Sequence, residues 1–124
     1  MVHKNTIALN ILKGKTKKKY KVIIDTDPGV DDSACIIFTL FDKKLDIKLF
    51  TTVSGNVNVK TGTRNMLHLL DKFNKDFPVA MGAEKAMYRV TPNAENVHSK
   101  EGMGGYLPPK EIKHPLLKED AVEA

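Results

Sequence analysis

The hydrophobic and polar positions of residues 21–82 switch between two periodicities. Three short apolar runs, KVIIDTD at 21–27, DIKLFTTV at 46–53 and PVAM at 78–81, are typical of strands. Between them, apolar residues recur at helical spacing over residues 30–41 and 57–73. This alternation of strand and helix produces a parallel sheet with right-handed crossovers. The pattern therefore predicts an α/β fold, a Rossmann-like parallel sheet with flanking helices.

The same pattern carries expectations about burial and about the C-terminal part of the chain. The first strand, 21–27, is expected to be buried, and the helix at 30–41 is apolar over much of its girth, so we expect it to be covered on several sides. Cys35, inside that helix, is then a buried small hydrophobe. Residues 88–113, with isolated apolar positions, predict a long loop, and residues 116–124 are expected to begin another helix without completing it.

Composition and charge divide the chain into two parts. Its 124 residues, 41% apolar and 28% charged, are typical of one soluble globular domain. The net charge is +5, but seven lysines and no acidic residue lie in residues 1–21, so the remainder is slightly acidic. We therefore expect a basic leader at 1–20, a domain at 21–124, and neither a nucleic-acid nor a membrane partner. With one cysteine and no signal peptide, the sequence indicates a cytoplasmic protein.

Four carboxylates fall within DTDPGVDD, residues 25–32, at the turn between the first strand and the first helix. In an open α/β sheet such a turn lies at the C-terminal edge, where ligands bind. Asp31 and Asp32 diverge by about 100° around the helix, so one can face Asp27 while the other addresses a different group. Oxygen ligands without nearby His or Cys favour Ca²⁺ or Mg²⁺ over zinc, although this turn alone cannot complete a calcium shell.

Two other motifs can be compared with this turn by their spacing. An EF-hand loop starting at Asp25 needs glycine at its sixth position and glutamate at its twelfth, where this chain has Val30 and Ile36. A D-x-D phosphatase of the haloacid dehalogenase type fits residues 25–27 but not Pro-Gly at 28–29. The phosphatase is kept as a weaker enzyme alternative. A structural role, in which the aspartates complement the helix N-terminus, is the other alternative.

DTDPGVDD resembles the N-terminal signature D-x-D-P-G-x-D-D of the inosine-uridine-preferring nucleoside hydrolases. Further segments resemble the family in the same order: TTVSGNVNVKTGTRN at 51–65, FPVAMG at 77–82 and VHSKEGMGG at 97–105. In the last of these, Ser99 stands where a glycine usually follows the histidine. The resemblance runs from about Lys21 to Pro109.

The resemblance implies a calcium-dependent enzyme of nucleoside salvage that hydrolyses the N-glycosidic bond of a ribonucleoside to ribose and free base. By resemblance, Asp27 is the general base and a calcium ligand, Asp32 is a calcium ligand, and Asp31 binds ribose hydroxyls. Asn56 lines the ribose and metal pocket, and His98 lies near the nucleobase. The metal lowers the pKa of the attacking water, and Asp27 takes its proton. For Asn56 a simple turn role, and for His98 a solvent-exposed position, remain open.

The length of the chain leads to a second hypothesis. Family members are more than twice as long, so we expect the leaving-group acid and the remaining calcium ligands to be missing from these 124 residues. The chain is then either the N-terminal part of such an enzyme or a catalytically silent module with a structural or partner-binding role. The sequence leaves base preference and homo-oligomer formation open.

Overall fold

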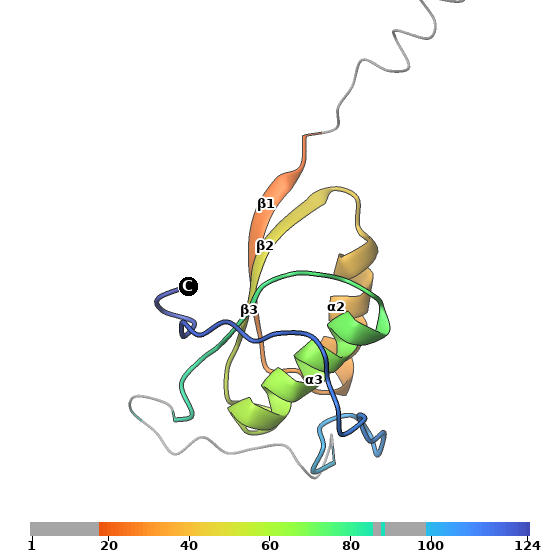
Figure 1. Cartoon of the computed structure of the whole chain (residues 1–124), viewed down its shortest axis with the longest axis vertical. Helices are drawn as coiled ribbons and strands as arrows, with labels where there is room; N and C mark the ends of the chain where they lie inside the picture. Colours follow the sequence, from red (N-terminus) through yellow and green to blue (C-terminus); the bar gives the residue numbers. More distant parts are fainter. Residues whose placement is uncertain (1–17, 86–87, 89–98) are drawn as a thin grey trace, which may run out of the picture.

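Three strands form one parallel sheet within residues 18–85, Tyr88 and residues 99–124, the part of the chain that this computed structural model describes. The elements follow in the order β1 (Tyr20–Thr26), α2 (Val30–Phe41), β2 (Leu45–Thr52), α3 (Val59–Lys72) and β3 (Val79–Met81). The strand order is β1-β2-β3, so β2 is central (Figure 1). The predicted α/β fold is confirmed, with every element within two residues of its predicted bounds.

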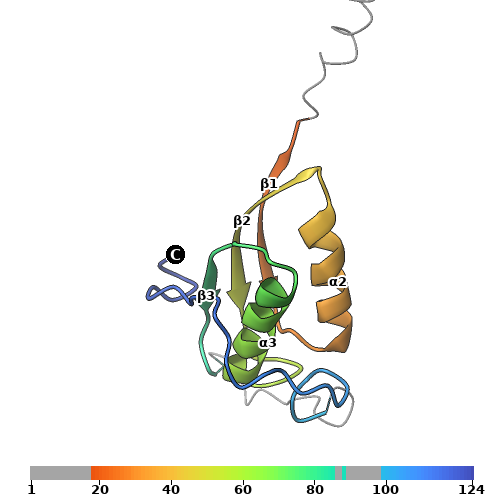
Figure 2. The ribbon, with the colours of Figure 1, turned by 45° about the vertical axis from the view of Figure 1, so that its right-hand side comes forward.

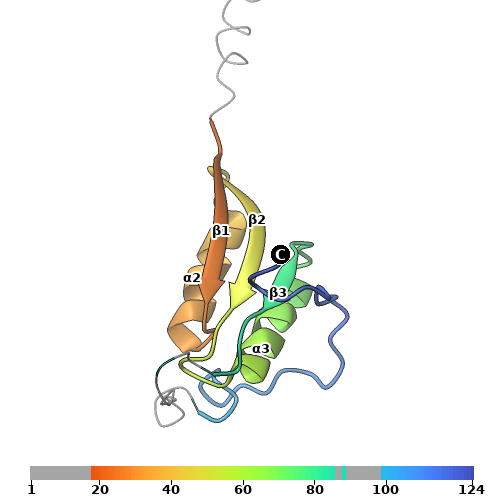
Figure 3. The same ribbon diagram turned by 90° about the vertical axis from the view of Figure 1, so that its left-hand side faces the viewer.

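Both helices lie on the same face of the sheet. Figure 2 shows α2 and α3 side by side against the strands, and Figure 3 shows the opposite face of the strands turned toward the viewer. This follows from two right-handed crossovers that step in the same direction along the sheet. The N-terminal ends of both helices therefore lie at the C-terminal edge of the strands, where the carboxylates are.

The core fills the space between the sheet and the two helices. Phe50 of β2 and Met66 of α3 are completely buried and anchor it. The buried hydrophobic cluster consists of Ile36, Leu40, Ile47, Phe50, Met66, Leu69, Leu70 and Val79. The pairing of β1 with β2 shifts by one residue between Val22 and Ile23. Beyond the shift Ile24 pairs with Phe50, and Ile24 packs against this cluster.

Three expectations about burial are wrong. β1 is an edge strand with Ile23 64% exposed, and α2 leaves Phe38 78% exposed. Cys35 is exposed as well, on the outer side of α2. The reason is the layer arrangement, because the described residues place no element over the outer side of α2 or over the face of β1 that the helices leave open (Figure 3). Periodicity identified the apolar positions, but it does not determine what covers them.

The C-terminal part of the described chain, residues 99–124, contains no helix or strand. This agrees with the predicted loop as far as residues 99–113 are concerned, but the helix expected within 116–124 is wrong. The backbone N–H groups of Leu117 and Ala121 donate instead to the carbonyls of Val79 (2.9 Å) and Met81 (3.1 Å). The outer edge of β3 thus takes up donors that a helix would have used internally.

Two further expectations concern residues that the structure does not describe. Residues 1–17 of the predicted basic leader lie outside the described residues, as does His98. No helix in the described part of the chain is long and apolar enough to span a membrane.

Candidate active site

Asn56 connects the carboxylate turn, residues 25–32, to the turn that follows β2. Its backbone N–H donates to Oδ2 of Asp27 at 2.8 Å, and its side-chain Nδ2 donates to Oδ2 of Asp32 at 2.8 Å. Nδ2 also lies 3.2 Å from the carbonyl oxygen of Asp27. The structure therefore brings Asp27, Asp32 and Asn56 together at the C-terminal edge of the sheet.

Gly55 makes this approach sterically possible. A Cβ at position 55 would lie 2.2 Å from Oδ2 and 2.8 Å from Cγ of Asp27, far inside van der Waals contact. The Gly55 N–H donates to the carbonyl of Val57 at 3.0 Å, which closes the turn. Only glycine lets the Asn56 amide reach the carboxylate in this turn.

Two threonine hydroxyls also donate to carboxylates of this turn, those of Asp32 and Asp25. The Thr26 hydroxyl donates to Oδ1 of Asp32 at 2.9 Å, so both carboxylate oxygens of Asp32 accept a hydrogen bond. The Thr51 hydroxyl donates to Oδ1 of Asp25 at 2.6 Å, across the β1–β2 pair. Asp25 is thus held by the neighbouring strand, whereas Asp27 and Asp32 share Asn56.

The remaining predicted site residues lie differently. Asp31 is exposed in the first turn of α2, next to Asp32. Asp32 shares Asn56 as a hydrogen-bond partner with Asp27. His98 lies outside the described residues, but Ser99, the residue after it, has a left-handed backbone with φ of 67°. Glycine adopts that conformation at lower cost than serine.

The chemistry of these side chains fits part of a hard-cation site. Asp27, Asp32 and the amide of Asn56 offer only oxygen as ligand atoms, which suits Ca²⁺ or Mg²⁺. Among the residues described, no three His, Cys, Asp or Glu side chains are grouped as a metal site. Asp27 and Asp32 are thus two carboxylate ligands that such an ion could use, with Asn56 beside them.

Asn65 of α3 contacts the carboxylate turn, its neighbour Arg64 contacts Glu101, and the sequence did not assign either a role. Asn65, fully buried, donates from Nδ2 to the carbonyl of Pro28 at 3.1 Å and to that of Glu101 at 2.8 Å. Arg64 forms an ion pair with the Glu101 side chain. The only sequence signal was a polar pair directly before the apolar position Met66, and Thr63 and His68 are polar residues buried on the same helix.

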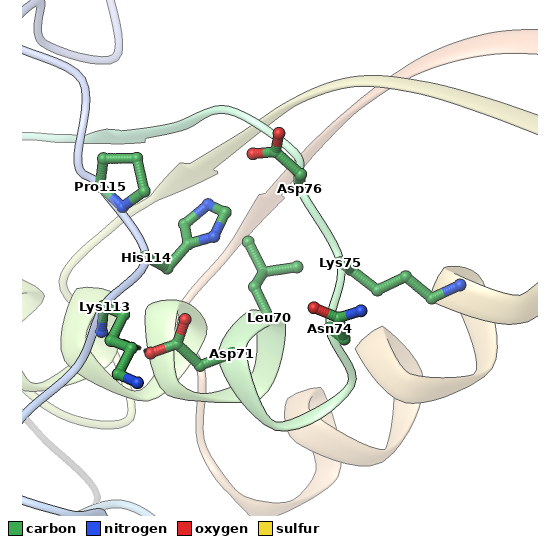
Figure 4. Close-up of a pocket in the computed structure, with 8 residues that line it drawn as sticks. All are labelled: Leu70, Asp71, Asn74, Lys75, Asp76, Lys113, His114 and Pro115. Atoms are coloured by element: carbon green, nitrogen blue, oxygen red, sulfur yellow. Dashed lines mark hydrogen bonds between the residues drawn. The ribbon is translucent and has the colours of Figure 1, made fainter.

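A cavity of about 230 Å³ lies at the opposite end of α3 (Figure 4). Its polar groups are engaged by the backbone, since Asp71 accepts the Lys113 N–H at 2.6 Å and His114 donates to the Phe77 carbonyl at 2.8 Å. These contacts attach residues 113–115 to the helix. The cavity is therefore explained by chain packing and is remote from the carboxylate turn.

His68, also on α3, contacts the C-terminal segment through Tyr106. Its ring stacks on that of Tyr106 with centroids 5.6 Å apart, and Nε2 lies 3.3 Å from the tyrosine hydroxyl. Burial, and then the charge of Lys72, lower the pKa of His68. A neutral imidazole in this packed position has a structural role, consistent with its having no assigned chemistry.

Comparison with known proteins decides the family. Residues 22–124 match the sequence model described as inosine-uridine preferring nucleoside hydrolase. The chain belongs to this family. The nucleoside hydrolase resemblance inferred from DTDPGVDD is thus confirmed, and it favours this family over the D-x-D phosphatase alternative.

Individual nucleoside hydrolases agree in sequence and in fold. A non-specific ribonucleoside hydrolase, RihC, of Klebsiella pneumoniae is 46% identical over 97 residues, which cover 78% of this chain and 32% of the relative. A solved plant nucleoside hydrolase, PpNRh1, is 37% identical with a TM-score of 0.74, over 83% of this chain and 33% of that one. A purine-preferring ribonucleoside hydrolase from Gardnerella vaginalis is 27% identical with a TM-score of 0.75, over 83% and 34%. The chain thus spans about a third of the length of these relatives.

Proposed function

We propose that this chain provides the N-terminal part of a calcium-dependent nucleoside hydrolase that cleaves ribonucleosides to ribose and free base in cytoplasmic nucleoside salvage. Residues 21–124 then form the N-terminal part of the hydrolase domain, and residues 1–20 are a basic leader. The membership in the family and the names of the relatives support the reaction class.

Within this proposal the residues of the carboxylate turn have separate tasks. Asp27 and Asp32 hold the divalent ion, which activates the water nucleophile when it is bound. Asp27 accepts the proton of that water, and we assign this to Oδ1 because Oδ2 already accepts the Asn56 amide. Asp31 binds the ribose hydroxyls, Asn56 lines the pocket, and His98 contacts the base. Carboxylates around the sugar also suit a transition state with oxocarbenium character.

One observation carries the proposal, namely that a single residue, Asn56, hydrogen-bonds to both Asp27 and Asp32. The backbone N–H of Asn56 holds Asp27 and its side-chain Nδ2 holds Asp32, so one residue draws two negatively charged side chains to the same turn. Such a concentration of negative charge is favourable when a cation is shared and costly otherwise. The pair supports a divalent-ion site whose other ligands come from outside the described residues.

A chimera tests the function directly. Residues 21–124 of this chain replace the matching first third of the Klebsiella relative, and reducing-sugar release is measured with inosine and uridine, with and without chelator. We expect hydrolysis that the chelator abolishes, and loss of that hydrolysis in Asp27→Asn. The matched control is Asp46→Asn, an aspartate that pairs with Lys48 at the start of β2. A folded chimera without turnover, beside an active parent, would contradict the proposal.

The 124-residue chain assayed alone distinguishes the second hypothesis, a catalytically silent module. The incomplete ligand shell among the described residues favours this outcome for the isolated chain. Turnover by the chain alone would refute the silent module. Size-exclusion chromatography in the same experiment reports whether copies of the chain associate.

A further inference from the structure

Helix α3 holds two segments that are far apart in the sequence. Asn65 donates to Pro28 inside the carboxylate turn and to Glu101 in the segment 99–105, with distances of 3.1 Å and 2.8 Å. Arg64, its neighbour, pairs with the Glu101 carboxylate. Figures 1 and 2 show the segment after residue 99 beside the N-terminal ends of α2 and α3. One amide group thus connects the candidate site to the loop next to it.

Close packing holds the carboxylate turn against α3 and the segment 99–105 against Val57, just before α3. A Cβ on Gly62 would lie 3.3 Å from Cδ of Pro28, and a Cβ on Gly102 would lie 2.7 Å from Val57. Gly102 has φ of 71°, a conformation that L side chains rarely adopt. Gly104 lies against Val30, the first residue of α2. Neither the turn nor the loop can shift far without breaking the Asn65 hydrogen bonds.

The side chain of Asn65 donates two hydrogen bonds but leaves one of its own atoms without a partner in the described part of the chain. Its Oδ1 is buried and has no hydrogen-bond partner among the described residues, and neither has Nε of Arg64. An unsatisfied buried acceptor destabilises a fold, but the two donated bonds satisfy the carbonyls of Pro28 and Glu101, which an apolar side chain of similar size would leave unpaired. The contact that Asn65 makes is therefore a link between these two carbonyls, one in the carboxylate turn and one in the segment 99–105.

We propose that Asn65, assisted by Arg64, is a positioning residue for the carboxylate turn. It fixes the Pro28 carbonyl, and through Pro28 it keeps Asp27 within reach of the Asn56 N–H, while it holds the segment 99–105 at a set place beside the turn. The inference rests on the proposed function in one respect, that the turn binds a divalent ion. Asn65 itself touches neither Asp27 nor Asp32 in any contact described here.

Amide hydrogen exchange of the full chain, measured with and without calcium chloride, tests the inference. In Asn65→Leu both donated bonds are lost, so we expect the amides of Asn56 and Gly102 to exchange about tenfold faster. The Phe50 amide, which donates to the Pro78 carbonyl in the sheet, should be unchanged. Calcium affinity by calorimetry should fall about tenfold, as is usual when a residue behind a metal ligand is removed.

Milder variants keep the test decisive if Asn65→Leu does not fold. Arg64→Gln should speed exchange at Gly102, and Arg64→Lys should restore it because the ion pair with Glu101 is retained. The matched control is Lys60→Gln, which breaks the Lys60–Glu84 ion pair one turn earlier on α3 and should move neither amide.

The outcomes separate this inference from the proposed function. Uniformly faster exchange, Phe50 included, would show a purely structural Asn65 and overturn the inference, as would unchanged exchange at Asn56. If the wild-type chain binds no calcium, the metal part of the proposed function fails. The exchange of Asn56 and Gly102 without calcium still decides the role of Asn65.

Discussion

The first βα unit, β1 with α2, and the second, β2 with α3, differ sharply in how much of each is buried. α3 buries eight of its fourteen residues and β2 is buried along most of its length. α2 buries only three of twelve, and most of β1 is exposed or half-exposed. Their sequences predicted helix and strand equally well in both units. The difference therefore lies in what covers each unit and not in its local propensity.

The candidate site lies across the boundary between these units. The carboxylates Asp27 and Asp32 belong to the exposed unit, whereas Asn56 and Asn65, which hold the turn in place, belong to the buried one. A metal site requires ligands that supporting residues hold in a fixed orientation. The buried unit β2–α3 therefore positions the carboxylates that the exposed unit β1–α2 carries.

The largest expected effect contrasts one phenylalanine from each unit. Phe50→Ala removes a ring that is completely buried between sheet and helices, so we expect a loss of about 3–5 kcal/mol in the free energy of unfolding. Phe38→Ala trims a ring that is 78% exposed and should change it by less than about 0.5 kcal/mol. Urea denaturation of both variants measures the contrast. Similar losses would mean that α2 is covered in solution.

The next largest effect is expected at Gly55, where the two units contact each other. Gly55→Ala forces a methyl group into the Asp27 carboxylate, so Asn56 must withdraw. We expect a cost of about 1–3 kcal/mol in stability and a fall of at least about tenfold in calcium affinity, measured by denaturation and calorimetry. Ser54→Ala, at the preceding position, adds no atoms and is the control. Unchanged affinity in Gly55→Ala would disprove the close approach.

These contrasts also show how far the sequence could be interpreted. The strands and helices were predictable because hydrophobic periodicity is local, and DTDPGVDD and the Gly-Asn turn were predictable as parts of one motif. The exposure of Cys35 and Phe38 was not, because burial depends on neighbouring layers. Asn65 was missed because a buried asparagine acts through contacts with Pro28 and Glu101, 37 and 36 positions away in the chain.

A smaller effect concerns pH, through His68 in the buried unit. Burial lowers its pKa, so as pH falls through the ordinary value of 6.5 the unfolded chain takes up this proton before the folded protein does. The contribution of His68 to stability is therefore complete above pH 6.5 and is lost on acidification below it. Urea midpoints at about pH 7.5 and about pH 5 should differ less in His68→Gln than in the wild type. An unchanged difference would contradict the assigned role.

The smallest effect lies in the loop attached to α3. Ser99 has positive φ, and its hydroxyl accepts the Gly105 N–H at 3.2 Å. Ser99→Gly relieves a left-handed conformation worth about 1 kcal/mol and loses one long, exposed hydrogen bond worth about 0.5 kcal/mol. We expect a net gain of about 0.5 kcal/mol in the urea denaturation of the full chain. A net loss would mean that the hydroxyl bond outweighs the backbone strain.

Calorimetric titration of calcium into the full chain tests most directly whether Asp27 and Asp32, gathered by Asn56, hold a divalent ion. We expect weak binding, about 10⁻³ M, that Asp27→Asn and Asp32→Asn each abolish. Asp25→Asn, in the same turn but held by Thr51, should bind as the wild type does. Equal binding by all four proteins, or none by the wild type, would contradict the account.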